Sequence, residues 1–122
     1  MQINGIKLYD SELKVMDILW EQGDVEAKKI TKILAQQISW SITTTYTVIK
    51  KLIDKKAIER IDPGYICRAL VTKEQAREYE TTELINKMYD GADAVLVASI
   101  LGRKKLTLKE IEHLENIIKD LK

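Results

Sequence analysis

Hydroxyl and ammonium side chains, which can bind phosphate groups and the edges of bases, are concentrated between residues 40 and 57. If this stretch is a helix, Ile49, Leu52 and Ile53 share a face that can be buried. The other side lacks a carboxylate and carries most of the polar residues: Thr43, Thr44, Tyr46, Thr47 and Lys50. A helix that only meets water usually mixes both charge signs. The stretch therefore predicts a helix that lies in a groove of DNA.

The lysines are unevenly distributed along the chain. The 122 residues carry a net charge of only +1, yet residues 27–53 contain five lysines and no acidic residue. A local cationic surface is typical of proteins that bind nucleic acids. A lysine-rich face that meets only solvent is the alternative interpretation.

The sequence offers little for catalysis or metal binding. Its one cysteine, Cys67, and one histidine, His113, are too few for an internal disulfide or a structural zinc site. His113 lies among charged residues of an amphipathic helix, where a solvated imidazole is expected. We therefore predict a protein that is not an enzyme and needs no metal or cofactor. Since the chain has neither a secretion leader nor an apolar run of about 18 residues, we predict no membrane insertion and a cytoplasmic location.

Two further helices are expected before the DNA-facing one. The first covers about residues 11–21, and the second, of about a dozen residues, is capped by Asp24 and turns Val25 inward. Residues 38–40 are too few for a helix and are expected to form a connector that could hold a single β bridge. Ser41 then caps the third helix.

The hydrophobic period changes after residue 57. Residues 58–61 and 65–70 are rich in β-branched and aromatic side chains, and Asp62-Pro63-Gly64 between them is a strong turn signal. Three helices followed by a β-hairpin predict a mainly α fold with a small β wing, the winged helix-turn-helix. In that architecture the third helix enters the major groove and the hairpin flanks it.

The expected DNA contacts fall into two classes. Base edges are assigned to the outer face of the third helix: Thr43, Tyr46, Thr47 and Lys50. Phosphates are assigned to its flanks and to the wing: Ser41, Thr44, Lys51, Tyr65 and Arg68. Tyr65 fits equally well as a cross-strand packing partner.

The C-terminal part has a different character. Capping boxes at Thr72 and Thr107 open two amphipathic helices, and between them residues 94–101 are apolar nearly all round. Such a helix needs burial on several sides, which a second copy of the chain can supply. We predict a DNA-binding domain over residues 1–71 and a three-helix dimerisation region over residues 72–122. The expected contacts between protomers are Leu84, Met88, Val97, Leu101, Ile111, Leu114 and Ile118; the alternative is that residues 94–101 pack under their own winged-helix domain.

Three segments resemble the penicillinase-repressor family (BlaI/MecI/CopY type). Residues 10–20 (DSELKVMDILW) resemble its first helix. The spacing Trp40-Ser41-x-x-Thr44-x-x-Thr47-x-x-x-Lys51-Leu52-x-x-Lys55 resembles its recognition helix. Tyr89-x-Gly91 and Leu106-Thr107-x-x-Glu110-Ile111 fit its C-terminal part. The resemblance covers nearly the whole chain.

The resemblance implies a homodimeric repressor that binds an inverted-repeat DNA operator of a resistance or stress operon. In the antibiotic-responsive branch a membrane sensor protease triggers cleavage of the repressor, and the bond concerned corresponds here to Ser99-Ile100 rather than Asn-Phe. The chain also departs from the family pattern at Ile42, where Pro or a polar residue is usual, at Lys56, where Gly is common, and at Ala69, where the wing often has Tyr.

A protein-binding module is the main alternative to a DNA-binding repressor. A winged-helix domain that docks another protein would be expected to expose leucine, methionine or aromatic anchors where this chain has hydroxyls and lysines. The acid-free surface between Lys28 and Lys51 favours DNA. Retention on heparin that depends on salt would separate the two functions.

Overall fold

The computed structural model describes residues 5–122. The chain divides between Thr81 and Thr82 into two compact units, and helix α4 (Lys73–Met88) runs from the first unit into the second. Each unit is described separately below.

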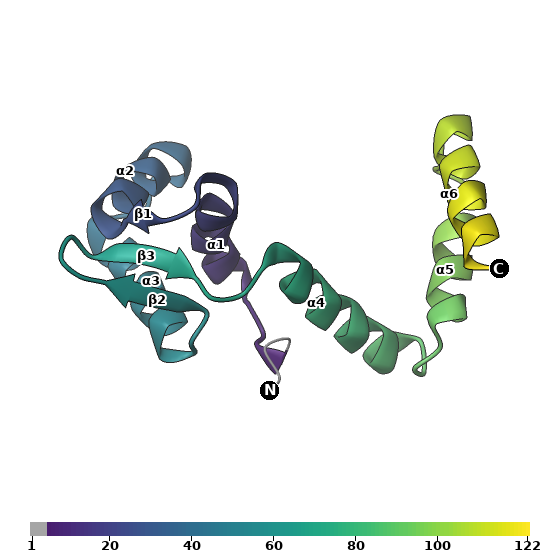
Figure 1. The fold of residues 1–122 in the computed structure, drawn as a ribbon, viewed down its shortest axis with the longest axis horizontal. Coiled ribbons are helices and arrows are strands. Elements are labelled where there is room, and N and C mark those ends of the chain that lie inside the picture. The colour runs from purple at the N-terminus through teal and green to yellow at the C-terminus, as the bar shows by residue number, and fades with distance from the viewer. Residues whose placement is uncertain (1–4) are drawn as a thin grey trace. The chain divides into compact units, whose positions relative to one another are not determined.

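Before α4, the first unit consists of three helices and a small antiparallel sheet, which Figure 1 shows. Its elements before α4 are α1 (Asp10–Gln22), β1 (Val25–Glu26), α2 (Ala27–Ile38), α3 (Ile42–Asp54), β2 (Ile58–Ile61) and β3 (Ile66–Ala69). The strands lie in the order β1-β3-β2, so that the predicted hairpin of β2 and β3 gains one short neighbour. Three helices followed by this hairpin form a winged helix-turn-helix, as the sequence predicts.

The short strand β1 makes the second helix begin later than the sequence predicts. Val25 pairs with Cys67 in β1, and α2 begins only at Ala27, with Glu26 rather than Asp24 as its N-cap. The Ala27 backbone N–H donates to the carbonyl oxygen of Tyr65 at 2.9 Å, which satisfies a polar group at the edge of β3. The expectation of a β bridge at residues 38–40 is wrong, because α2 continues to Ile38 and ends at Ser39 in the left-handed region.

One hydrophobic core joins the helices to the sheet. Its largest fully buried side chains are Met16, Ile30, Leu34, Ile49, Leu52 and Ile58. Trp20 lies at the edge of this core, and its indole N–H donates to the carbonyl oxygen of Val71 at 2.8 Å. This bond ties α1 to the segment that leads into α4. Burial of Ile49 and Leu52 fixes which side of α3 faces outward.

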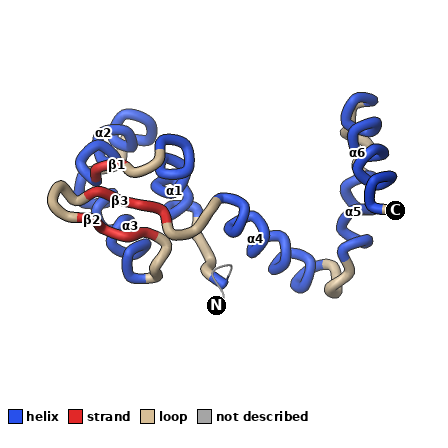
Figure 2. Tube along the Cα trace, viewed as in Figure 1, coloured by secondary structure: helices blue, strands red, loops and turns tan. Residues whose placement is uncertain are grey.

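The second unit is entirely helical (Figure 2). It holds the end of α4, then α5 (Asp93–Gly102) and α6 (Leu108–Leu121). As predicted, α6 begins with a capping box: Thr107 Oγ1 accepts the Glu110 N–H at 3.1 Å, and the Glu110 carboxylate accepts the Thr107 N–H at 2.9 Å. None of the residues of α5 or α6 is buried, although both helices are rich in apolar side chains. No helix in the described part of the chain combines the length and apolar character that crossing a membrane requires.

Candidate nucleic-acid interface

Helix α3 presents the polar face that its sequence predicts. Thr45, Val48, Ile49 and Leu52 are buried, whereas the threonine and lysine side chains at positions 43, 44, 47, 50 and 51 are exposed. No acidic residue lies in its first turn. The first turns of the helix therefore offer hydroxyl and ammonium groups to a partner without a carboxylate that would repel phosphate. The one acidic residue of α3, Asp54, is exposed at its C-terminal end.

The N-terminus of α3 is organised by hydroxyl groups. Ser41 is the N-cap: its Oγ accepts the backbone N–H of Thr44 at 3.1 Å and donates to Thr44 Oγ1 at 2.9 Å. Other backbone N–H groups of the first turn have no partner within the helix and favour an anion there. Ser41 and Thr44 thus lie where a phosphate would meet the start of the helix.

Thr47 has a defined hydrogen-bonding role on the outer face. Its hydroxyl donates to the carbonyl oxygen of Thr43 at 2.9 Å. Because the proton is used within the helix, the Thr47 oxygen is left as an acceptor, and its methyl group is left for apolar contact. These properties suit the amino groups of adenine or cytosine and the methyl group of thymine.

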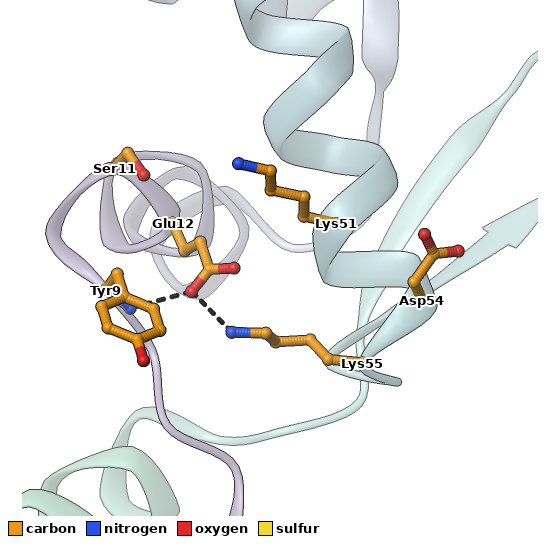
Figure 3. A pocket seen from close by; sticks show the side chains of 6 residues that line it. All are labelled: Tyr9, Ser11, Glu12, Lys51, Asp54 and Lys55. Atoms are coloured by element: carbon orange, nitrogen blue, oxygen red, sulfur yellow. Dashed lines mark hydrogen bonds and ion pairs between the residues drawn. The ribbon is translucent and has the colours of Figure 1, made fainter.

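Lys51 lies beside a polar cluster that joins the end of α3 to the start of α1 (Figure 3). The buried Glu12 carboxylate accepts the Tyr9 backbone N–H at 2.8 Å and pairs with Lys55 Nζ at 2.7 Å. Lys55 Nζ also donates to the carbonyl oxygen of Lys7 at 2.8 Å. In Figure 3, Lys51 extends from α3 toward the start of α1. The Glu12–Lys55 pair thereby fixes the end of α3 against α1.

Replacing Glu12 with Ala is expected to destabilise the first unit by roughly 1.5–3 kcal/mol, the usual cost of losing hydrogen bonds to a charged group. Glu12→Gln should cost less, because an amide oxygen can still accept the Tyr9 N–H. Urea unfolding monitored by circular dichroism measures both changes, and Asp17→Asn, at an exposed position of α1, is the matched control. An Ala variant as stable as this control would show that the pair contributes nothing.

The hairpin of β2 and β3 contacts α3 through aromatic rings. The Tyr46 ring of α3 lies 5.6 Å from the Tyr65 ring, measured between centroids, and the two planes are tilted by 57°. On the Tyr65 ring lies the guanidinium of Arg60, with its Cζ 3.7 Å from the centroid. Burial raises the pKa of the Tyr65 phenol above its ordinary value. Tyr46 and Tyr65, both assigned to DNA from the sequence, are therefore also packing partners of each other.

Arg68, which the sequence assigns to a phosphate contact, is paired with acidic side chains. Its Nε and Nη2 both donate to Asp24 Oδ2, at 3.1 and 2.9 Å, and its Nη1 lies 4.0 Å from Glu59. The hydrogen bond to Asp24 raises the pKa of the guanidinium further. Arg68 is paired with Glu59 across the strands and follows the buried Cys67, so it lies on the sheet face opposite the core.

Arg60 is not among the residues assigned to DNA from the sequence, yet it lies on the Tyr65 ring that contacts α3. The signal was present in strand alternation: Ile58 faces the core, so Arg60, two residues later, shares the face of the sheet that meets α3. Cys67, its cross-strand neighbour, is buried, and burial raises the pKa of its thiol to about 11. The thiol is therefore protonated and acts as a packing group. Within residues 5–122, no three His, Cys, Asp or Glu side chains come together as a metal site would require.

The sequence as a whole matches the model of the penicillinase repressor family over residues 8–120. The chain belongs to the penicillinase repressor family. It is 30% identical over 114 residues to the methicillin resistance regulatory protein MecI of Staphylococcus aureus (strain N315), covering 92% of this chain and 93% of MecI. It is 25% identical over 118 residues to the penicillinase repressor of Bacillus licheniformis, covering 95% of this chain and 92% of that repressor.

The fold of this penicillinase-repressor family member matches a solved structure. The solution structure of the DNA-binding domain of the repressor BlaI superposes with a TM-score of 0.51 and 24% sequence identity. The match covers 57% of this chain and 93% of the BlaI domain. It confirms the winged-helix fold predicted from three helices and a hairpin.

Proposed function

We propose that this protein is a transcriptional repressor that binds a DNA operator as a homodimer, with α3 in the major groove and the hairpin of β2 and β3 beside it. The observation that carries this proposal is the outer face of α3, where exposed threonines and lysines stand without an acidic neighbour in the first turn. Membership of a repressor family supports the same function. Apolar anchors, which a protein-docking surface needs, are scarce on this face; Ile42 is the exception.

Within this proposal, the contacts of α3 divide between base edges and phosphates. Thr43, Tyr46, Thr47 and Lys50 remain our candidates for base contacts. Ser41, Thr44 and Lys51 remain the candidates for phosphate, since they lie at the helix start and beside α1. Tyr65 and Arg68 were assigned to phosphate as well; Tyr65 adjoins α3, whereas the charge of Arg68 is offset by Asp24.

The proposed homodimer rests on the second unit. Many of its large apolar side chains are exposed, among them Leu84, Met88, Val97, Leu101, Ile111 and Ile118, and Leu114 is half-buried. Exposed apolar side chains on three successive helices support the proposal of an interface there. A second copy would cover it with its own equivalent residues, as a two-fold interface requires. An inverted-repeat operator is the DNA counterpart of that symmetry.

The proposed biological role follows the family. The matched relatives are named as a penicillinase repressor and as a methicillin resistance regulatory protein. We propose that this protein controls a resistance or stress operon, and that a membrane sensor protease is a partner in its release from DNA. Cleavage would fall in α5, at Ser99-Ile100.

Replacing Thr47 with Ala should cost about 1–3 kcal/mol of binding at the operator and relax sequence choice there, as expected for a lost base contact. Lys51→Ala should instead weaken binding to all sequences and flatten the dependence of affinity on salt. Selection of tight-binding duplexes from a random DNA library supplies the probe, and fluorescence anisotropy over a range of salt concentrations gives both quantities. Thr81→Ala, an exposed position of α4, is the matched control.

Two outcomes would contradict this assignment. A Thr47→Ala, Tyr46→Ala double variant with unchanged operator affinity would remove α3 from base contact. A wild-type protein that enriches no duplex and shows no salt-dependent binding would favour the alternative, a winged-helix module that binds protein.

A further inference from the structure

The register of the wing places one arginine on the side of the sheet that meets the recognition helix. Arg60 pairs with Cys67 in the antiparallel ladder of β2 and β3, and directly opposed residues point to the same face. Cys67 is fully buried, so this face is the one against the core. Arg60 itself stays exposed because β2 is an edge strand. Its long side chain therefore passes along the edge of the core toward solvent.

Tyr65 holds that arginine next to α3. Tyr65 is the last residue of the turn before β3 and has a φ of 49°, which places it next to the end of the strand that carries Arg60. The guanidinium lies 3.7 Å from the Tyr65 ring centroid, and the same ring lies 5.6 Å from Tyr46 of α3. The carbonyl of Tyr65 is held by the Ala27 N–H. Arg60, Tyr65 and Tyr46 thus form a continuous series of contacts from the wing to the recognition helix.

The other arginine of the wing has a different environment. Arg68 uses its Nε and Nη2 on one carboxylate and lies within 4.0 Å of a second, on the outer face of the sheet. Among the described residues, the one acidic side chain in ion-pair contact with Arg60 is Asp62, bound at Nε at 3.2 Å. A contact at Nε leaves the outer edge of the guanidinium as the part that can meet a further anion.

We propose that Arg60 is the cation of the wing that contacts the DNA backbone, and that the tilted Tyr65–Tyr46 ring pair positions it beside the groove occupied by α3. Arginine suits this role because a planar guanidinium can stack on a ring and still donate to a phosphate. A stacked side chain also loses less conformational freedom when it binds. The inference rests on the proposed DNA-binding function and adds to it a residue and the device that orients it.

The test compares Arg60→Ala with Arg68→Ala in the full-length protein. Both variants are titrated against the duplex recovered by selection and against a mixed-sequence duplex, at salt concentrations from about 50 to 300 mM. Each phosphate contact contributes about 0.9 to the slope of log affinity against log salt. Arg60→Ala should lower that slope by about 0.9 for each protomer bound and weaken binding on the order of tenfold, whereas Arg68→Ala should leave the slope unchanged.

Two further variants separate charge from structure. Arg60→Lys keeps the charge and should keep the salt slope while losing part of the affinity, since an ammonium cannot stack in the same way. Tyr65→Leu should weaken binding several-fold in the wild-type background but not in the Arg60→Ala background, because the ring is proposed to act through Arg60. An equal effect of Tyr65→Leu in both backgrounds would overturn the positioning role.

These measurements test the role of Arg60 separately from the proposed DNA-binding function. If the wild-type protein binds neither duplex in a salt-dependent way, the proposed function fails. If it binds and Arg60→Ala keeps the wild-type slope, or if Arg68→Ala loses as much slope as Arg60→Ala, the inference is overturned and the proposed function stands. A slope lost equally in Arg60→Lys and Arg60→Ala would also overturn it, because charge would then not be the cause.

Discussion

Replacing Val97 or Ile118 with Asp is expected to convert the proposed dimer into a monomer. Each side chain is 50% exposed within its own chain, so an aspartate there would be solvated in a single protomer and need not disturb its fold. In a dimer interface the same aspartate would be an unpaired charge in an apolar contact, which costs several kcal/mol. Operator affinity should then fall by about 10²–10⁴-fold, because the two DNA-binding units no longer act together.

Sedimentation equilibrium and anisotropy with the selected duplex measure the two effects. Asn116→Asp introduces the same charge at an exposed polar position of α6 and should leave the dimer intact. Far-ultraviolet circular dichroism should show that all three variants keep their helices. A wild-type protein that sediments as a monomer at micromolar concentration would exclude the dimer.

Local signals account for much of what the sequence predicts correctly. Ser41 and Thr107 cap helices as expected, since a cap needs only a hydroxyl and backbone N–H groups two or three residues away. The hairpin follows from the turn Asp62-Pro63-Gly64, in which Gly64 has a φ of 100°. Lys56 has a φ of 64°. Glycine adopts such a positive φ most easily, which explains why the family often has Gly at this position.

Contacts between distant parts of the chain account for the errors and omissions. Val25 suits a helix face as well as a strand, and its strand partner Cys67 cannot be identified from local pattern. The Asp24–Arg68 pair joins residues 44 positions apart, so the sequence alone could not show that the charge of Arg68 is offset. Nothing in the local sequence pattern singles out Arg60, because the role proposed for it depends on the hairpin register and on the contact between Tyr65 and Tyr46 of α3.

Helix α5 carries the bond at which we propose that cleavage releases the protein from DNA. The bond between Ser99 and Ile100 lies in α5, and both residues are exposed within the chain. Tyr89 and Ser99 are linked by one long hydrogen bond of 3.4 Å between their hydroxyl oxygens. A cut there would detach α6, which carries Ile111, Leu114 and Ile118 of the proposed interface. In a dimer the bond would be covered, so cleavage would require local opening of α5.

Cleavage between Ser99 and Ile100 is therefore expected to lower operator affinity by about 10²–10⁴-fold, the gain that two linked DNA-binding units provide. A recognition site for a specific protease, inserted at this bond, allows operator affinity to be measured before and after the cut. The same site inserted at the basic loop of residues 103–105 tests whether the loss of affinity depends on where α6 is released. In the native host, treatment with a cell-wall antibiotic followed by an immunoblot should show a shortened band as the operon switches on. A full-length band that persists during induction would exclude cleavage and leave control by a ligand, by redox change or by another protein.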